Sequence, residues 1–460
     1  KYCDLNNKNL LEHKIEPFSL RKFLLMFFSY RFLRKAQNQT SIAAYIRYKS
    51  NNLYIEGLSV EKLADNNQTP FYCYSERYIE DQYKALKSAF DMDTKIFYSM
   101  KANSNISILK LLLNKGSGID VVSGGEIERA ITAGATGKDI IYAGVGKTDE
   151  ELTYAIKTKI HCINVESQSE LTRINDICEK LNTKQNISLR VNPDVDAKTH
   201  VKITTGKAEN KFGIEFDYIQ SMYAIASELP NINISGISVH IGSQITNLKP
   251  FKKAFQIIYD LINDLRGLGH KIKHVDLGGG LGVTYSEDDS VPTFKEYASL
   301  IQSIFGNLNV EVYIEPGRLL FANSGLLVTR VIDIKKTSQK TFIIVDAAMN
   351  DFIRPTLYSS YHEILPVKNN LGTSNKLYDI VGPICETGDY FAKNRSMNSV
   401  QVGSLIAIKS TGAYGSVLSS NYNSRPQIAE IMVQNDKYEV IRDRVEVKDI
   451  LTRERIANWL

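Results

Sequence analysis

Lys95-Ile-Phe-Tyr-Ser-Met-Lys-Ala102 is an apolar run that ends in polar residues, and runs of this kind recur along the middle of the chain. The others span residues 118–123, 140–144, 162–167, 187–193, 234–242, 272–280 and 310–317. Segments between them, such as 106–113, 126–133 and 251–265, carry apolar residues at the three- and four-residue steps of amphipathic helices. Strands that alternate with helices indicate a parallel sheet. Eight units favour a closed (β/α)8 TIM barrel, and periodicity alone leaves an open doubly wound sheet as the alternative.

The pattern changes after about Leu319. Short strand-like runs then alternate with turns, at residues 326–334, 341–347, 377–382, 405–409 and 428–433. They predict a C-terminal antiparallel β-sandwich or β-barrel domain. Residues 48–56 also read as strand, and we expect them to join that domain and make it discontinuous. The predicted division is an N-terminal extension of unknown role (1–46), a strand segment of the β domain (47–71), the barrel (72–319) and the β domain (320–460).

The composition is that of a globular protein with more than one core. The chain has 460 residues, 43% of them hydrophobic and 23% charged, and a length of this kind predicts two domains. The net charge of +5 is slight and gives no reason to expect a nucleic-acid partner. The five cysteines form no CxxC pair, which favours reduced thiols in a cytosolic or organellar interior, and we expect a cytoplasmic protein. Only His270 and His274 have HxxxH spacing, without the glutamate of HExxH, so we expect no metal site.

The extension contains an apolar run, residues 23–28, within a stretch that carries several arginines. A membrane-spanning helix needs about 20 apolar residues, so we expect no membrane partner. A basic, acid-poor segment of this type also occurs in targeting sequences, which leaves import into an organelle as an alternative. We place the extension outside the fold.

The predicted strands end in residues that carry chemistry. Lys101, His240, the run Gly278-Gly-Gly280 and the segment Glu315-Pro-Gly-Arg318 all follow strands, and barrel enzymes build their sites at the C-terminal ends of strands. A strand-end lysine is usually a solvated charge. Beside these groups, an amine kept neutral by its surroundings could bind an aldehyde covalently.

The glycine run and Glu315 each have two interpretations. Gly278-Gly-Gly-Leu-Gly282 suggests a dinucleotide fingerprint, but Val283 stands where the last glycine of GxGxxG belongs, so a barrel phosphate site fits better. Glu315 could form an ion pair with Arg318, or it could keep a pyridine nitrogen protonated. His240 could be a packed core histidine, or it could stack on a cofactor ring.

Together these segments resemble the fold-type III pyridoxal-phosphate decarboxylases, and among them the diaminopimelate decarboxylase family. The resemblance covers the chain from about residue 47 to the end. It implies an alanine-racemase-like barrel with a C-terminal β domain. The motifs that carry it are Tyr98-Ser-Met-Lys-Ala-Asn103, Asp120-Val-Val-Ser-Gly-Gly-Glu126, Gly144-Val-Gly-Lys147, Asn164-Val-Glu-Ser167, Arg190-Val-Asn-Pro193, His240-Ile-Gly-Ser-Gln244, Glu315-Pro-Gly-Arg318, Arg354-Pro-Thr-Leu-Tyr358, Gly382-Pro-Ile-Cys-Glu-Thr-Gly-Asp389 and Gly412-Ala-Tyr-Gly415.

The resemblance implies a role for each matched residue. Lys101 would hold pyridoxal 5'-phosphate covalently, and Cys385 would be the second catalytic residue, a proton donor. The residues implied in cofactor binding are Lys101, Asp120, Arg190, His240, Ser243, Gly280, Glu315, Gly317, Arg318 and Tyr414. Those implied in substrate binding are Arg318, Arg354, Tyr358, Glu386 and Tyr414. Cys385 and Glu386 would reach the site from the partner subunit of a homodimer with shared active sites.

The implied reaction is the decarboxylation of meso-2,6-diaminopimelate to L-lysine and CO2, the last step of lysine biosynthesis. Arg354 with Tyr358 suits a substrate with a distal carboxylate, because a guanidinium binds a carboxylate through two parallel hydrogen bonds. Decarboxylases of ornithine, arginine or carboxynorspermidine, a racemase and a catalytically silent cofactor carrier are the alternatives. The departures from the family pattern are small: Ser99-Met100 before the lysine, Ala348 where a glycine is common, and Val201-Lys202 after His200.

Overall fold

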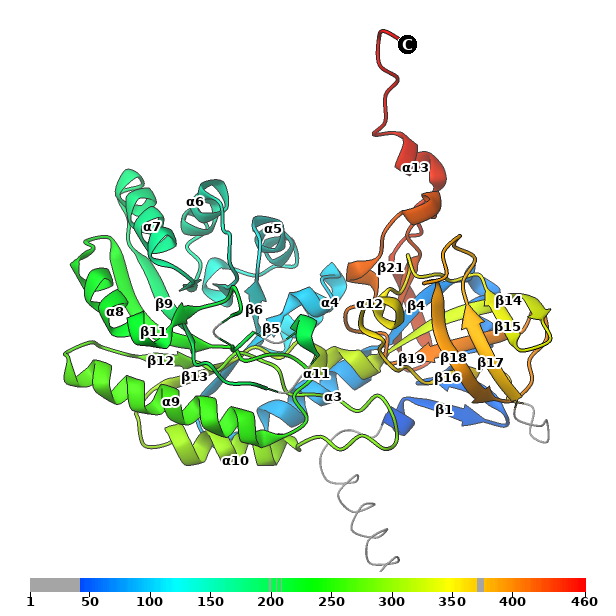
Figure 1. Cartoon of the computed structure of the whole chain (residues 1–460), viewed down its shortest axis with the longest axis horizontal. Helices are drawn as coiled ribbons and strands as arrows, with labels where there is room; N and C mark the ends of the chain where they lie inside the picture. Colours follow the sequence, from blue (N-terminus) through cyan, green and yellow to red (C-terminus); the bar gives the residue numbers. More distant parts are fainter. Residues whose placement is uncertain (1–41, 198–199, 204, 208, 370–375) are drawn as a thin grey trace, which may run out of the picture.

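The computed structural model describes residues 42–460 except 198–199, 204, 208 and 370–375. Figure 1 shows two bodies side by side, a barrel surrounded by helices and a mainly β body. The predicted extension, residues 1–46, lies almost wholly outside the described residues. No helix in the described part of the chain is long and apolar enough to cross a membrane.

The barrel consists of eight parallel strands, as the sequence predicts. In chain order each strand pairs with the next, and the last pairs with the first, so the sheet closes. A two-residue strand, β10 (Ile214–Glu215), adds to β9. The barrel strands are β5 (Thr94–Ser99), β6 (Gly118–Val121), β7 (Ile140–Tyr142), β8 (Cys162–Val165), β9 (Gln185–Asn192), β11 (Ile232–Val239), β12 (His274–Asp276) and β13 (Glu311–Ile314).

The outer helices follow their sequence signals. In α9, the apolar residues from Phe251 to Leu265 recur at helical steps and are buried, so this stripe packs onto the barrel. Thr148 and Thr293 each begin a helix with a capping box. The helices are α3 (Glu76–Lys87), α4 (Ile106–Asn114), α5 (Gly124–Thr132), α6 (Asp149–Lys157), α7 (Gln168–Lys180), α8 (Ile219–Glu228), α9 (Leu248–Gly267), α10 (Phe294–Phe305) and α11 (Arg318–Phe321).

The β body contains strands from both ends of the described chain. Its main sheet has the order β18-β17-β15-β14-β4-β20-β21, and β19 pairs with β14 and β16. Most of its pairings are antiparallel, but β4 with β20 and β15 with β17 are parallel. The strands are β4 (Phe71–Ser75), β14 (Gly325–Lys336), β15 (Thr341–Val345), β16 (Ile364–Pro366), β17 (Lys376–Val381), β18 (Tyr390–Met397), β19 (Leu405–Lys409), β20 (Ala429–Gln434) and β21 (Lys437–Arg442).

The segment before the barrel packs on this body. Three short strands form a separate sheet, β1 (Ile46–Lys49), β2 (Asn52–Ile55) and β3 (Leu58–Ser59), followed by α2 (Val60–Asn66). The Leu53 amide donates to the Val367 carbonyl at 2.8 Å, and Leu53 and Ile55 share a buried cluster with Leu326. The expected boundary between residues 71 and 72 falls inside β4. The division into domains stays a prediction, and the pairings of β4 favour counting this strand with the β body.

Candidate active site

Most of the predicted site residues line one cavity at the carboxyl ends of the barrel strands. They come from β5, β11, β12, β13 and a loop of the β body, which the closed barrel brings to one mouth. Asp120, Arg190, Arg354, Tyr358, Cys385 and Glu386 do not line it. The predicted residues that do are Lys101, His240, Ser243, Gly280, Glu315, Gly317, Arg318 and Tyr414.

Lys101 follows β5 in a short 3-10 turn, Met100–Ala102. Its Nζ lies 3.9 Å from Oδ2 of the buried Asp120. Burial lowers the pKa of Lys101, but the charges of Asp120, Tyr414 and Glu315 outweigh that effect, so the pKa is raised. The expectation of a neutral amine is therefore wrong for the protein on its own, because these acidic groups stabilise the ammonium.

Asp120 lies near the carboxyl end of β6, and within the described residues only one of its two carboxylate oxygens has a hydrogen-bond partner. Ser99 Oγ donates to Oδ2 at 2.5 Å, whereas Oδ1 is buried and has no partner among the described residues. Burial raises the pKa of this carboxyl, although Lys101 and Ser99 act against it. A buried acceptor without a donor is rare in folded proteins and marks a place where a ligand's polar group can fit.

Glu315 follows β13 and is buried against a second carboxyl. It shares a hydrogen bond with Asp276, the last residue of β12, and its pKa is raised well above the usual range by burial and by the charges of Asp120 and Asp276. The pKa of Asp276 is raised to about 6, mainly by burial. Arg318 donates to Tyr285 and Ser243. The ion pair considered for Glu315 and Arg318 is therefore not among those that the structure describes. A buried carboxyl beside others can hold or transfer a proton, which suits pairing with a ring nitrogen.

The triple glycine turn forms a cradle that no larger residue could form. A Cβ on Gly279 would lie 2.2 Å from the Glu315 carbonyl oxygen, and one on Gly280 would lie 2.3 Å from the Gly242 carbonyl oxygen. Gly278 and Gly280 also have positive φ angles of 64° and 105°. Bare backbone at a strand end lets amide groups approach an anion closely. With Ser243 and Arg318 beside it, the turn fits a phosphate.

His240 is held as a neutral ring. Its Nδ1 accepts a hydrogen bond from the Gly279 amide at 3.1 Å, so a proton on this ring belongs on Nε2. Burial and then the charges of Lys101 and Arg190 lower the pKa of His240 well below its usual value. The ring lines the cavity with Lys101, and stacking on a cofactor stays a prediction.

Two buried arginines meet at a tyrosine that the sequence reasoning missed. Arg318 Nη1 donates to the Tyr285 hydroxyl at 2.6 Å, and Arg354 Nη2 reaches the same oxygen at 3.3 Å. The Arg318 guanidinium also lies over the Tyr414 ring, 4.7 Å from its centroid, and that of Arg354 lies 5.7 Å from the Tyr358 centroid. Its position in the sequence could have indicated it, because Tyr285 lies in the loop after β12 that begins with the triple glycine.

Arg190 and the pair Cys385 and Glu386 lie outside the cavity. Arg190 Nη1 donates to Glu166 Oε1 at 2.6 Å, which holds its guanidinium against this carboxylate. Cys385 and Glu386 are exposed in a loop of the β body, and the Cys385 amide donates to Asn423 Oδ1 at 3.3 Å. Among the described residues, no group of three or more histidine, cysteine, aspartate or glutamate side chains could hold a metal ion.

Comparisons with known proteins agree with this geometry. The family model described as "Pyridoxal-dependent decarboxylase, pyridoxal binding domain" matches residues 76–322. The chain is 44% identical to the diaminopimelate decarboxylase of Aquifex aeolicus, over 87% of this chain and 95% of that protein. It is also 44% identical to the one from Vibrio cholerae, over 90% and 99%.

Solved structures give the same result. The diaminopimelate decarboxylase of Helicobacter pylori complexed with L-lysine is 40% identical, with a TM-score of 0.82 over 85% of this chain and 98% of that chain. The enzyme from M. jannaschii in complex with L-lysine is 34% identical, with a TM-score of 0.87 over 92% and 100%. The closed barrel, the family model and these relatives together show that the chain belongs to the diaminopimelate decarboxylase family of pyridoxal-phosphate-dependent enzymes.

Proposed function

We propose how the described residues carry out this family's reaction, the pyridoxal-phosphate-dependent decarboxylation of meso-2,6-diaminopimelate to L-lysine and CO2. The observation that carries the proposal is the presence of Lys101, Glu315 and the triple glycine turn in one cavity. An amine, a proton-holding carboxyl and a phosphate cradle are three groups that a phosphorylated pyridine aldehyde requires. Their common location supports the cofactor-binding roles implied by the sequence.

The protein's own groups have separate tasks. Bound pyridoxal phosphate supplies an electron sink for the electron pair left by the departing carboxylate. Lys101 Nζ holds the cofactor and can move a proton at the reacting carbon. Glu315 keeps a proton at the ring nitrogen, and Ser243, Gly280 and Arg318 bind the phosphate. Asp120 holds the charge of Lys101 in place.

The substrate groups bind farther out. Arg354 and Tyr358 bind the carboxylate that the substrate keeps, since a guanidinium matches a carboxylate in shape and charge. Arg318 lies over the Tyr414 ring and donates to Ser243 at 3.1 Å, and it shares the Tyr285 hydroxyl with Arg354. A substrate without a distal carboxylate would leave the Arg354 charge unpaired, which disfavours ornithine.

The test is a substrate comparison with the purified protein loaded with pyridoxal phosphate. We expect meso-diaminopimelate to yield L-lysine and CO2, and ornithine and arginine to react at least about a hundredfold more slowly by kcat/KM. Equal turnover of ornithine and diaminopimelate would contradict the assigned carboxylate site. Cofactor binding without release of CO2 from any of the three would favour a silent carrier instead.

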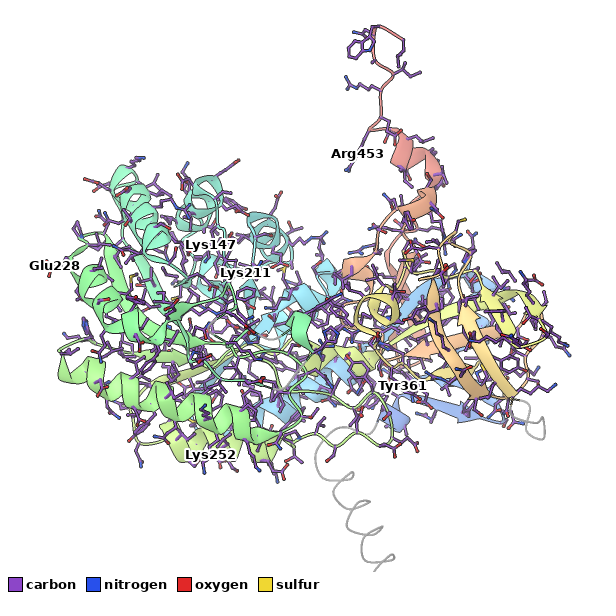
Figure 2. The ribbon with its side chains drawn as sticks, viewed as in Figure 1. Lys147, Lys211, Glu228, Lys252, Tyr361 and Arg453 are labelled. Carbon is purple, nitrogen blue, oxygen red and sulfur yellow. The ribbon has the colours of Figure 1, made fainter. Side chains whose placement is uncertain are left out.

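We also propose a homodimer in which Cys385 and Glu386 complete the partner's site. Both residues are exposed, although the resemblance assigns them to catalysis and substrate binding. After α13 (Val447–Leu451), residues 452–460 lead away from the body, as Figures 1 and 2 show, with Arg453 labelled. Ile456, Trp459 and Leu460 in this arm are 84%, 86% and 93% exposed. Exposed apolar side chains in this arm, together with the exposure of Cys385 and Glu386, support an interface with a second copy.

Mixing two inactive variants tests the shared site. Neither Lys101→Ala nor Cys385→Ala should be active alone. After the subunits are exchanged, half of the dimers are mixed and each mixed dimer has one site without a substitution, so about a quarter of wild-type activity should return. No recovery, with exchange verified by mass, would contradict the shared site.

We propose a cytoplasmic location for the enzyme. Cys73, Cys162, Cys178 and Cys385 are free thiols, which suits a reducing compartment. Fluorescence of the full-length tagged protein in its native cell would test this location. A signal confined to an organelle would instead favour a targeting role for the extension.

A further inference from the structure

Tyr285 occupies a fixed position that none of the roles above uses. It lies in the loop after β12, and its amide donates to Asp289 Oδ2 at 2.7 Å. Its ring meets His362 edge to face, with centroids 5.2 Å apart. His362 Nε2 in turn accepts from Arg354 Nε at 3.4 Å, while His362 Nδ1 donates to the Lys409 carbonyl at 2.9 Å. The phenol is thus oriented by both the barrel and the β body.

Two cations converge on the Tyr285 oxygen, and the described part of the chain places no carboxylate in an ion pair with them. Arg318 and Arg354 are 6% and 5% exposed, and both donate to the Tyr285 hydroxyl. Among the described residues, their hydrogen bonds go to Ser243, Tyr285 and His362, and no ion pair joins either arginine to a carboxylate. Buried charges without partners are costly, so this arrangement is built to receive anions. The substrate's carboxylate and the cofactor's phosphate are the two that the reaction provides.

The Tyr285 phenol can donate to such an anion. Its oxygen already accepts from both guanidiniums, so its single O–H points away from them. Burial raises the pKa of Tyr285, but the charges of Arg318 and Arg354 outweigh burial and lower it. A more acidic phenol is a stronger donor, and a hydrogen bond from it to a carboxylate is charge-assisted.

We propose that Tyr285 is a specificity-determining residue that binds, together with Arg354, the carboxylate that the substrate retains in the product. The inference rests on the proposed function, since it deepens the assignment of the same site. It assigns three donors to this carboxylate, the two of the Arg354 guanidinium fork and the phenol.

The test compares ligands that differ only in this carboxylate, with the cofactor-loaded enzyme and its Tyr285→Phe variant. L-Lysine carries the carboxylate, and 1,5-diaminopentane lacks it. Loss of the phenol O–H should weaken L-lysine binding and raise KM for diaminopimelate by about tenfold, with kcat nearly unchanged. Binding of 1,5-diaminopentane, measured by calorimetry or as inhibition, should not change.

Tyr223→Phe is the matched control. Tyr223 is a fully buried tyrosine whose hydroxyl donates to the Gly236 carbonyl at 2.9 Å, away from the mouth. This variant should leave both ligands unaffected. The proposal is overturned if Tyr285→Phe changes neither ligand, or weakens both equally, which would indicate general damage to the site. Failure of the proposed function would look different, because the wild-type enzyme would then not convert diaminopimelate at all.

Discussion

Both ends of the barrel carry buried polar residues, but most of the predicted catalytic and cofactor-binding residues lie at the carboxyl ends of the strands. At the amino ends of the strands lies a set of side chains that we term the floor cluster. Its members are Lys95, His161, Cys162, Ser188, Ser235, His274, Glu311 and Tyr313. At the carboxyl ends lies the mouth, with Lys101, Asp120, His240 and Glu315.

The polar side chains of the floor cluster form hydrogen bonds and ion pairs with one another. Lys95 pairs with Glu311 at 2.8 Å, Tyr313 donates to Glu311 at 2.7 Å, and Ser188 Oγ lies 2.8 Å from His274 Nε2. No buried polar side-chain atom of this cluster lacks a partner in the part of the chain that the structure describes, whereas Asp120 Oδ1 at the mouth does. A fully satisfied hydrogen-bond network stabilises a core, whereas a buried acceptor without a donor is available to a ligand.

The largest expected difference concerns the two lysines. Lys101→Ala should lower kcat by about 10³-fold or more, because the amine holds the cofactor and moves the proton. Lys95→Ala removes a half-exposed partner of Glu311 and should keep kcat within about a factor of two. Steady-state assays of lysine formation measure both. Similar losses for the two variants would contradict the distinction between mouth and floor.

The second comparison uses two glutamates at opposite ends of β13. Glu315→Gln should lower kcat by about a hundredfold, since an amide cannot hold the proton at a ring nitrogen. Glu311→Gln is the control in the floor cluster and should have little effect on kcat. Activity of Glu315→Gln close to that of the wild type would remove the carboxyl from the mechanism.

The floor cluster should affect stability and not catalysis. Burial, and then the charge of His161, lowers the pKa of His274 to about 3, so protonation favours the unfolded chain. The stability from neutral His274 is complete above the unfolded pKa of about 6.5 and is lost as pH falls toward 3. Between pH 7 and pH 5 the wild type should lose about 2 kcal/mol more unfolding free energy than His274→Gln. Denaturant unfolding at both pH values measures this, and equal losses would disprove it.

The smallest effect tests the cradle. Gly280→Ala would place a Cβ 2.3 Å from the Gly242 carbonyl oxygen at a φ of 105°, and we expect cofactor affinity to fall about tenfold. Gly267→Ala, where a Cβ would meet nothing within 4 Å, is the control. Titration with pyridoxal phosphate measures both affinities. Unchanged affinity in Gly280→Ala would argue against a phosphate at the turn.

The barrel could be predicted from the sequence because each of its strands is a separate apolar run. In the β body, β14, β15, β17, β19 and β20 were predicted for the same reason. β18 was missed because Lys393, Asn394 and Arg395 interrupt its apolar pattern. This strand lies at the edge of the sheet, and its pairing with β17 has an irregular register. β4 precedes the barrel in sequence but pairs with distant strands, and local patterns carry no information on such pairing.

The candidate site could be predicted from the residues that follow strands, but its electrostatics could not. From the sequence we expected a neutral Lys101 amine, whereas the acidic groups around it raise its pKa. Tyr285 was missed, because its two arginine partners come from the end of β13 and from the β body. Both errors concern side chains far apart in sequence. Only the folded chain brings them together.

The most direct test of the account is to find which amine holds the cofactor. The protein is loaded with pyridoxal phosphate, reduced with borohydride, digested and analysed by mass spectrometry. We predict a phosphopyridoxyl group on the peptide that contains Lys101, and none on those that contain Lys95 or Lys147. A label on another lysine, or no label on a protein that still forms lysine, would contradict the account.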